Sequence, residues 1–134
     1  MRFLKYHLPV IIYAVGIFVV SSITVPADSV PIFPHSDKIF HALIYSLLSF
    51  LILRALYVSK PNRPALFLKI TSFTAAFSYG IMIEVYQYFL PARAMEVMDA
   101  LSNGLGALVG ILFFSKMRQY KIKIRKPDGK DSTV

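Results

Sequence analysis

The chain contains no cysteine, and only seven of its 134 residues are acidic. Without cysteine, disulfide bonds and thiolate metal sites are excluded. Charged residues of both signs make up only 16% of the chain, whereas 56% of the residues are hydrophobic, which is too apolar for a soluble domain of this size. The composition therefore predicts one small membrane domain.

Hydrophobic runs predict four transmembrane helices. The runs cover residues 8–25, 39–57, 70–90 and 97–114. Each is near the ~20 residues that a helix needs to cross a bilayer. Backbone groups in lipid must bond internally, so helices are the expected structure. We predict an all-α integral membrane protein whose four transmembrane helices form a compact bundle within residues 1–117.

The basic residues are distributed asymmetrically around these spans. Thirteen of the fifteen Lys and Arg residues lie near the N-terminus, around the second loop or after the fourth span, and only Lys38 and Arg93 lie elsewhere. Such an excess in alternate loops is typical of the cytoplasmic side of polytopic membrane proteins. Both termini are therefore predicted to be cytoplasmic, and the first and third loops to face outward.

The net charge of +8 indicates contact with an anionic membrane leaflet rather than with nucleic acid, because the basic residues flank hydrophobic spans. Residues 118–134 are predicted to form a disordered, basic cytoplasmic tail that binds the inner leaflet, at about 1 kcal/mol per basic residue near the surface. A cleaved signal peptide is the alternative for the first span, since Val25-Pro26-Ala27 resembles a cleavage site. Cleavage would leave the other three spans oriented as predicted.

Polar residues within the spans converge on the predicted outer end of the bundle. Asp37, His41 and Tyr45 have the spacing i, i+4, i+8 and share one helix face. Glu84 lies about 9 Å below the outer end of its span, at 1.5 Å per residue. An ionised carboxylate facing lipid is costly, so Glu84 should face the bundle interior. The residues that can reach this zone are Asp37, Lys38, His41, Tyr45, Glu84, Gln87, Arg93, Asp99 and Asn103.

One use of this set is binding. Arg93 and Lys38 are the two outward cations beside an apolar bundle, and arginine in particular suits phosphate and carboxylate groups. We expect them to hold an anionic headgroup. The other predicted binding residues are Asp37, Tyr45, Gln87 and Asn103.

The alternative use is catalysis on a lipid headgroup within the membrane. His41 would act as a general acid or base oriented by Asp37, while Glu84 and Asp99 would be a second acid or base. No cofactor is predicted, although these carboxylates are compatible with a divalent cation. The spacing lacks a strong zinc signature such as HExxH, and no Ser or Cys nucleophile motif is present. Binding is therefore favoured over catalysis.

The fourth span carries the spacing Gly106-x-x-x-Gly110, which gives a helix a flat face for close contact with another helix. Packing within the bundle is the simplest use of this face. The alternative is a structural scaffold that assembles with other envelope proteins through it.

Three motifs follow one another along the spans. They are Asp37-Lys38-x-x-His41-x-x-x-Tyr45, then Glu84-x-x-Gln87 with Pro91-x-Arg93, then Asp99-x-x-x-Asn103-x-x-Gly106-x-x-x-Gly110. This ordered set resembles the VanZ-like family of bacterial membrane proteins. One departure lies at Ala92-Arg93-Ala94-Met95-Glu96, where the family often has Ser or Thr and an aromatic residue after the Arg.

The resemblance implies a membrane fold and a cell-envelope setting, but no reaction. The founding member of the family is associated with resistance to the glycopeptide antibiotic teicoplanin. We therefore expect a multi-pass protein of the bacterial plasma membrane that binds or modifies a lipid-linked or amphiphilic anionic molecule at the outer face. A lipid-linked wall precursor and a glycopeptide are the candidate partners, beside the membrane lipids themselves.

Overall fold

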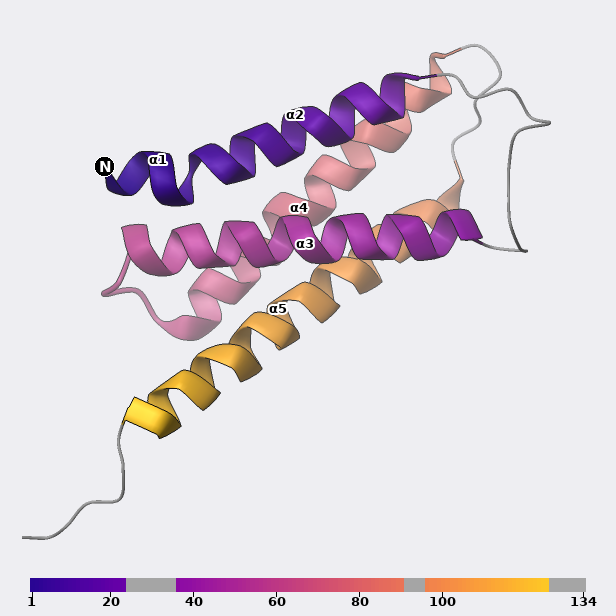
Figure 1. Cartoon of the computed structure of the whole chain (residues 1–134). Coiled ribbons are helices and arrows are strands. Elements are labelled where there is room, and N and C mark those ends of the chain that lie inside the picture. Colours follow the sequence, from indigo (N-terminus) through magenta and orange to yellow (C-terminus); the bar gives the residue numbers. More distant parts are fainter. Residues whose placement is uncertain (24–35, 91–95, 126–134) are drawn as a thin grey trace, which may run out of the picture.

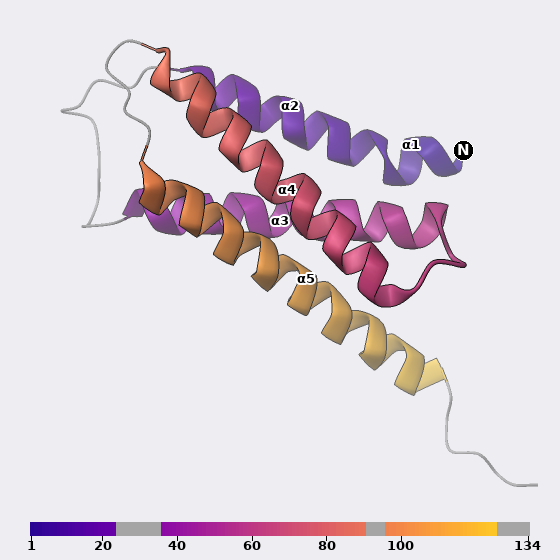
Figure 2. The same cartoon turned by 180° about the vertical axis from the view of Figure 1, so that it is seen from behind.

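The computed structural model describes residues 1–23, 36–90 and 96–125, and every regular element in these ranges is an α-helix. The helices are α1 (Arg2–Tyr6), α2 (Leu8–Ser22), α3 (Ser36–Ser59), α4 (Ala65–Tyr88) and α5 (Val97–Arg125). The helices α2 to α5 alternate in direction (Figure 1). α3 packs most extensively against α5, and α2 packs against α3 and α4 at the side of the bundle (Figure 2).

The alternation gives the bundle two distinct ends. The N-terminus, the turn between α3 and α4 and the end of α5 lie at one end, which we call the basic end (Figure 1). The start of α3, the end of α4 and the start of α5 lie at the other, which we call the polar end. Residues far apart in the sequence therefore meet at the polar end.

Local sequence explains several helix starts. Pro9 lies in the first turn of α2 and has no N–H to bond back to α1, so the two helices are separate. Pro64 immediately precedes α4. Asp37 and Asp99 lie in the first turns of α3 and α5, where a negative charge interacts favourably with the helix dipole.

Three of the helices are long and apolar enough to cross a membrane, namely Ser36–Ser59, Ala65–Tyr88 and Val97–Ile124. α2 is apolar but has only 15 residues, fewer than the ~20 that span a hydrocarbon core. The last residues of the first predicted span, 8–25, lie outside the described residues. The prediction of an all-helical membrane fold is confirmed, while four spans and cytoplasmic termini stay predictions.

The surface of the bundle is apolar along its length. Large hydrophobic side chains are well exposed on each of the four longer helices, for example Val15, Leu43, Met82 and Leu112. Soluble monomers rarely expose apolar surface on this scale, so the exterior suits a lipid environment.

The core lies between α3, α4 and α5. One cluster of buried side chains surrounds Tyr45 and Leu48, and a second, nearer the basic end, surrounds Leu53 and Phe114. Buried hydroxyl groups link the three helices between these clusters. Ser49 Oγ donates a hydrogen bond to the Ala107 carbonyl at 2.8 Å, and Ser72 Oγ donates to the Ser49 carbonyl at 2.8 Å.

The glycines of α5 set how closely α3 approaches. A Cβ atom at Gly106 would overlap the backbone of Ala42, and one at Gly110 would overlap the backbone of Ser46. The prediction of close helix contact through these glycines is confirmed, and α3 of the same chain is the partner. A scaffold that uses this face to bind another protein would have to displace α3.

α5 continues beyond the predicted end of the fourth span at residue 114. The helix runs to Arg125 because residues 111–126 contain neither glycine nor proline to stop it. Residues 118–125 of the predicted tail are therefore helical. Residues 126–134 lie outside the described part of the chain, and the lipid-binding role of the tail stays a prediction.

Candidate functional site

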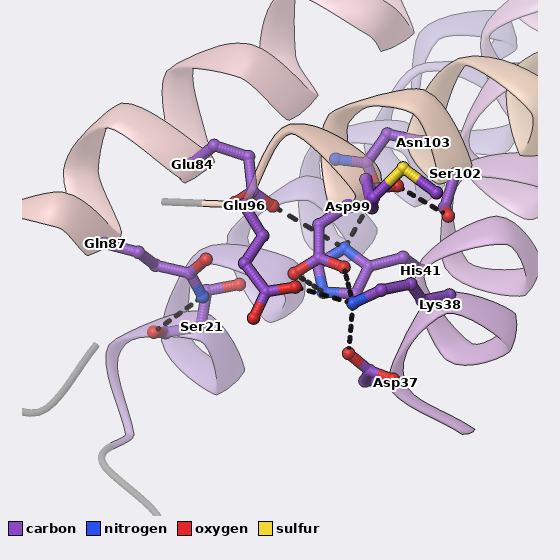
Figure 3. Close-up of polar contacts among 11 residues, drawn as sticks. Ser21, Asp37, Lys38, His41, Glu84, Gln87, Glu96, Asp99, Ser102 and Asn103 are labelled. Atoms are coloured by element: carbon purple, nitrogen blue, oxygen red, sulfur yellow. Dashed lines mark hydrogen bonds and ion pairs between the residues drawn. The ribbon is translucent and has the colours of Figure 1, made fainter. Parts of the chain in front are cut away.

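A charged cluster occupies the polar end and joins α3 to α5. Lys38, in the first turn of α3, donates from Nζ to three carboxylates (Figure 3). The acceptors are Asp37 Oδ2 at 2.6 Å, Glu96 Oε2 at 2.7 Å and Asp99 Oδ1 at 2.8 Å. Glu96 and Asp99 lie just before and within the first turn of α5, so one ammonium group ties the two helix starts together.

These ion pairs differ in exposure. The side chains of Asp37 and Glu96 are 44% and 53% exposed, whereas that of Asp99 is 13% exposed. Exposed pairs typically contribute only about 0–1 kcal/mol, so the sheltered pair with Asp99 matters most for stability. An anionic ligand would have to compete with all three carboxylates for Lys38.

His41 lies one turn further along α3. Its Nδ1 is 2.9 Å from Oδ1 of Asn103 on α5. An amide oxygen only accepts hydrogen bonds, so Nδ1 carries the proton and Nε2 of the neutral ring carries the lone pair. Nε2 lies 4.0 Å from Asp99 Oδ2, and Nδ1 lies 3.7 Å from Glu84 Oε1. The imidazole therefore stands between a carboxylate of α4 and one of α5.

Glu84 is fully buried, with 0% of its surface exposed. Within the described residues, neither of its carboxylate oxygens has a hydrogen-bond partner, and the same holds for Tyr45 Oη and Asn103 Nδ2. Buried polar atoms in native proteins are nearly always paired. The unpaired buried side-chain atoms of the described chain are therefore concentrated around one point.

Gly80 on α4 makes room for this arrangement. A Cβ atom there would lie 3.0 Å from Asn103 Nδ2 and 3.1 Å from Tyr45 Cε1. Its bare backbone lets α4 approach both neighbours at the level of the site. Gly80 is not among the predicted site residues, although it lies four residues before Glu84 and thus on the same helix face.

The structure brings together most of the predicted site residues. Those at the polar end or directly below it are Asp37, Lys38, His41, Tyr45, Glu84, Asp99 and Asn103. Gln87 is buried but points to α2, where its Nε2 donates to the Ser21 carbonyl at 3.4 Å, apart from the cluster (Figure 3). Arg93 lies outside the described residues.

Two contacts differ from those that the spacing predicts. The spacing predicts that Asp37 orients His41, but Asp37 pairs with Lys38, and Asn103 holds the imidazole. Glu96, which is not among the predicted site residues, is a direct partner of Lys38. Spacing shows which residues share a helix face, but not which neighbouring helix supplies their partners.

An apolar groove begins beside the charged cluster. It lies between α3 and α5, has a volume of about 440 Å³, and has Lys38 at its polar end. From there it extends about two helical turns toward the middle of the bundle. Its other lining residues are Ile39, Ala42, Leu43, Ser46, Ser102, Leu105, Gly106 and Val109.

Comparison with known families agrees with this architecture. The model of the VanZ/LLP1 family matches residues 6–118, from the end of α1 to the last part of α5. The chain belongs to the VanZ/LLP1 family. No curated protein and no solved structure gives a significant match. Family membership and three apolar helices of spanning length together identify a VanZ-like membrane protein.

Among the residues that the structure describes, two groups of side chains in this VanZ-like protein could hold a metal ion. In each group the ligand atoms lie within 4.8 Å of one another. The first group is His41, Glu84 and Asp99, and the second is Asp37, Glu96 and Asp99.

Proposed function

We propose that this VanZ-like protein is a multi-pass protein of the bacterial plasma membrane that binds a lipid-linked or amphiphilic anionic molecule at its outward-facing polar end. The observation that carries this proposal is the groove that leads from Lys38 down the apolar surface between α3 and α5. An amphiphile has the same two parts, a polar headgroup and an apolar chain. A lipid-linked wall precursor or a glycopeptide such as teicoplanin would fit this description, and a role in resistance would follow from binding it.

The charges of the site define what else the headgroup needs. Three carboxylates, those of Asp37, Glu96 and Asp99, surround the ammonium group of Lys38, and a fourth, that of Glu84, lies beside His41. An anionic headgroup therefore requires positive charge beyond Lys38. Arg93 lies three residues before Glu96 in the sequence, and a guanidinium group can bind phosphate with two parallel hydrogen bonds.

Modification of the headgroup is the second candidate function. The hydrogen bond from Nδ1 to Asn103 orients the His41 imidazole and leaves Nε2 facing Asp99. An oriented imidazole beside carboxylates can act as a general acid or base. Binding remains the preferred function because no nucleophile motif accompanies His41 in the sequence.

The test compares binding of a fluorescent polyprenyl phosphate by purified wild-type protein and by two variants of α5 in mild detergent. Leu105→Trp fills the groove, whereas Leu112→Trp is an equal change at an exposed position that does not line it. We expect Leu105→Trp to weaken binding by roughly tenfold, equivalent to about 1.4 kcal/mol, because the chain loses its buried contacts. Leu112→Trp should bind as the wild type does.

A third variant tests the headgroup contact. Arg93→Ala should weaken binding of the same probe while leaving binding of the uncharged polyprenol unchanged. If neither Leu105→Trp nor Arg93→Ala alters binding, the proposed site is wrong. If mass spectrometry shows that the probe is converted, and His41→Gln abolishes the conversion, the enzymatic function replaces the binding function.

A further inference from the structure

Several buried polar atoms below the charged cluster have no hydrogen-bond partner within the described residues. Glu84 is fully buried and aims its carboxylate at His41, yet neither of its oxygens has a hydrogen-bond partner within the described residues (Figure 3). A buried carboxylate without hydrogen bonds or a counter-charge is strongly disfavoured. An ionised Glu84 side chain therefore requires a positively charged or hydrogen-donating partner at this position.

The geometry around Glu84 matches that of metal ligands. One ligand atom from each of His41, Glu84 and Asp99 lies within 4.8 Å of the other two, and the distance from His41 Nε2 to Asp99 Oδ2 is 4.0 Å. Two donors that are each about 2.1 Å from the same metal ion lie roughly 3 to 4 Å apart. The three side chains come from α3, α4 and α5, so an ion between them would be held by all three helices of the core.

The other acidic group is already neutralised in part. Asp37, Glu96 and Asp99 surround Lys38 Nζ at 2.6 to 2.8 Å, and the ammonium group occupies the position that an ion would take there. Asp99 belongs to both groups, because its Oδ1 accepts from Lys38 while its Oδ2 faces His41. The charge that remains uncompensated is therefore on the side of His41 and Glu84.

We propose that His41, Glu84 and Asp99 bind one divalent metal ion. One imidazole nitrogen with two carboxylate oxygens suits Zn²⁺ or Mn²⁺ better than Ca²⁺ or Mg²⁺, which favour oxygen ligands alone. Three protein ligands leave coordination positions free for water or for a ligand oxygen. The metal site stands on these residues alone and does not depend on headgroup binding.

Asn103 completes the arrangement as a positioning residue. It accepts the Nδ1 proton of His41, which leaves Nε2 as the metal-binding nitrogen. Metal-bound histidines usually donate their second N–H to an oxygen in this way, and loss of that partner costs about 10- to 100-fold in metal affinity. A bridging role, in which the ion contacts an anionic headgroup, would rest on the proposed function.

In the experiment, purified protein in mild detergent is treated with EDTA and then titrated with Zn²⁺, Mn²⁺ and Mg²⁺. Calorimetry measures the binding. Absorption spectra with Co²⁺ report the donor atoms. We expect the wild type to bind one Zn²⁺ or Mn²⁺ per chain, more tightly than Mg²⁺. Glu84→Gln and Asp99→Asn should each weaken this binding by more than the roughly 10- to 100-fold loss expected for Asn103→Ala.

Glu96→Gln is the matched control, because it removes an equal charge from the group around Lys38. It should leave the affinity for the ion within about twofold of that of the wild type, since exposed charges couple weakly. Circular dichroism confirms that each variant is folded. The proposal is overturned if the wild type binds no ion saturably, if Glu84→Gln and Asp99→Asn bind it normally, or if Glu96→Gln weakens binding as much as they do. No lipid is present, so failure of headgroup binding leaves this result unaffected.

Discussion

At the scale of single residues, the informative feature is a carboxylate that burial should disfavour. The position of Glu84 within its predicted span indicates that it faces the bundle interior near His41, Asp99 and Asn103, and the structure confirms this. The sequence could not show that Lys38 is paired with Glu96, because that contact depends on how α3 and α5 are rotated relative to each other. Periodicity thus predicts the helix face on which a residue lies, whereas the interaction partner of its side chain depends on how the helices pack.

Replacement of Glu84 by glutamine should stabilise the metal-free protein. Glutamine keeps the shape of the side chain and removes the buried charge that has no hydrogen-bond partner among the described residues. We expect the free energy of unfolding in EDTA to rise by about 1–3 kcal/mol. Residues at functional sites are commonly kept at such a cost in stability. Thermal unfolding followed by circular dichroism measures the effect.

The control for this change is Glu96→Gln, which should alter the free energy of unfolding by less than about 1 kcal/mol. Addition of Zn²⁺ should raise the melting temperature of the wild type and leave that of Glu84→Gln unchanged. A variant that is several kcal/mol less stable in EDTA would instead show that Glu84 is paired with a protonated His41 in a structural network.

At the scale of helices, the close contact between α3 and α5 determines the site. Gly106 and Gly110 let the two backbones meet, and this contact brings His41 of α3 within reach of Asn103 of α5. The glycine spacing in the sequence predicts such a contact but not its partner. The ends of the helices are less predictable from hydrophobicity than their centres. α5 extends past the apolar run because the residues that follow it favour helix whether or not they lie in lipid.

Gly106→Ala should destabilise the protein and weaken the site together. A single Cβ atom there overlaps the backbone of Ala42, which cannot move without shifting α3. We expect a loss of about 1–3 kcal/mol in the free energy of unfolding, as for other overpacked positions, and weaker Zn²⁺ binding because His41 moves away from α5.

Gly16→Ala is the control, since nothing lies within 4 Å of a Cβ atom at that position. It should leave stability unchanged or raise it by up to about 1 kcal/mol, as alanine favours helix more than glycine. Equal melting temperatures for both variants would contradict the role assigned to Gly106.

At the scale of the whole molecule, charge and aromatic residues separate the two ends. At the basic end, the Arg54 guanidinium lies 4.9 Å from the Tyr6 ring centroid and that of Arg118 lies 4.1 Å from the Tyr57 ring centroid. Basic and aromatic side chains together are typical anchors at a membrane interface. The acidic site lies at the opposite end of the same helices. The charge asymmetry in the sequence predicts this separation. The separation depends only on successive loops lying at alternate ends of the bundle, and not on how the helices pack.

The orientation of these ends in the membrane can be measured directly, because the chain has no cysteine and any introduced cysteine is the single reactive thiol. Asn62→Cys lies in the exposed turn at the basic end, and Ser29→Cys lies in the first loop of the sequence. In intact cells, a membrane-impermeant maleimide should label the Ser29 variant and reach the Asn62 variant only after permeabilisation, since basic loops stay in the cytoplasm.

Phe3→Cys then tests α2, whose 15 residues are few for a span. Labelling like the Asn62 variant means that α2 crosses the membrane, and labelling like the Ser29 variant means that it does not. The reverse pattern for Asn62 and Ser29 would place the polar end in the cytoplasm and contradict ligand binding from outside, while the metal site within the bundle would be unaffected.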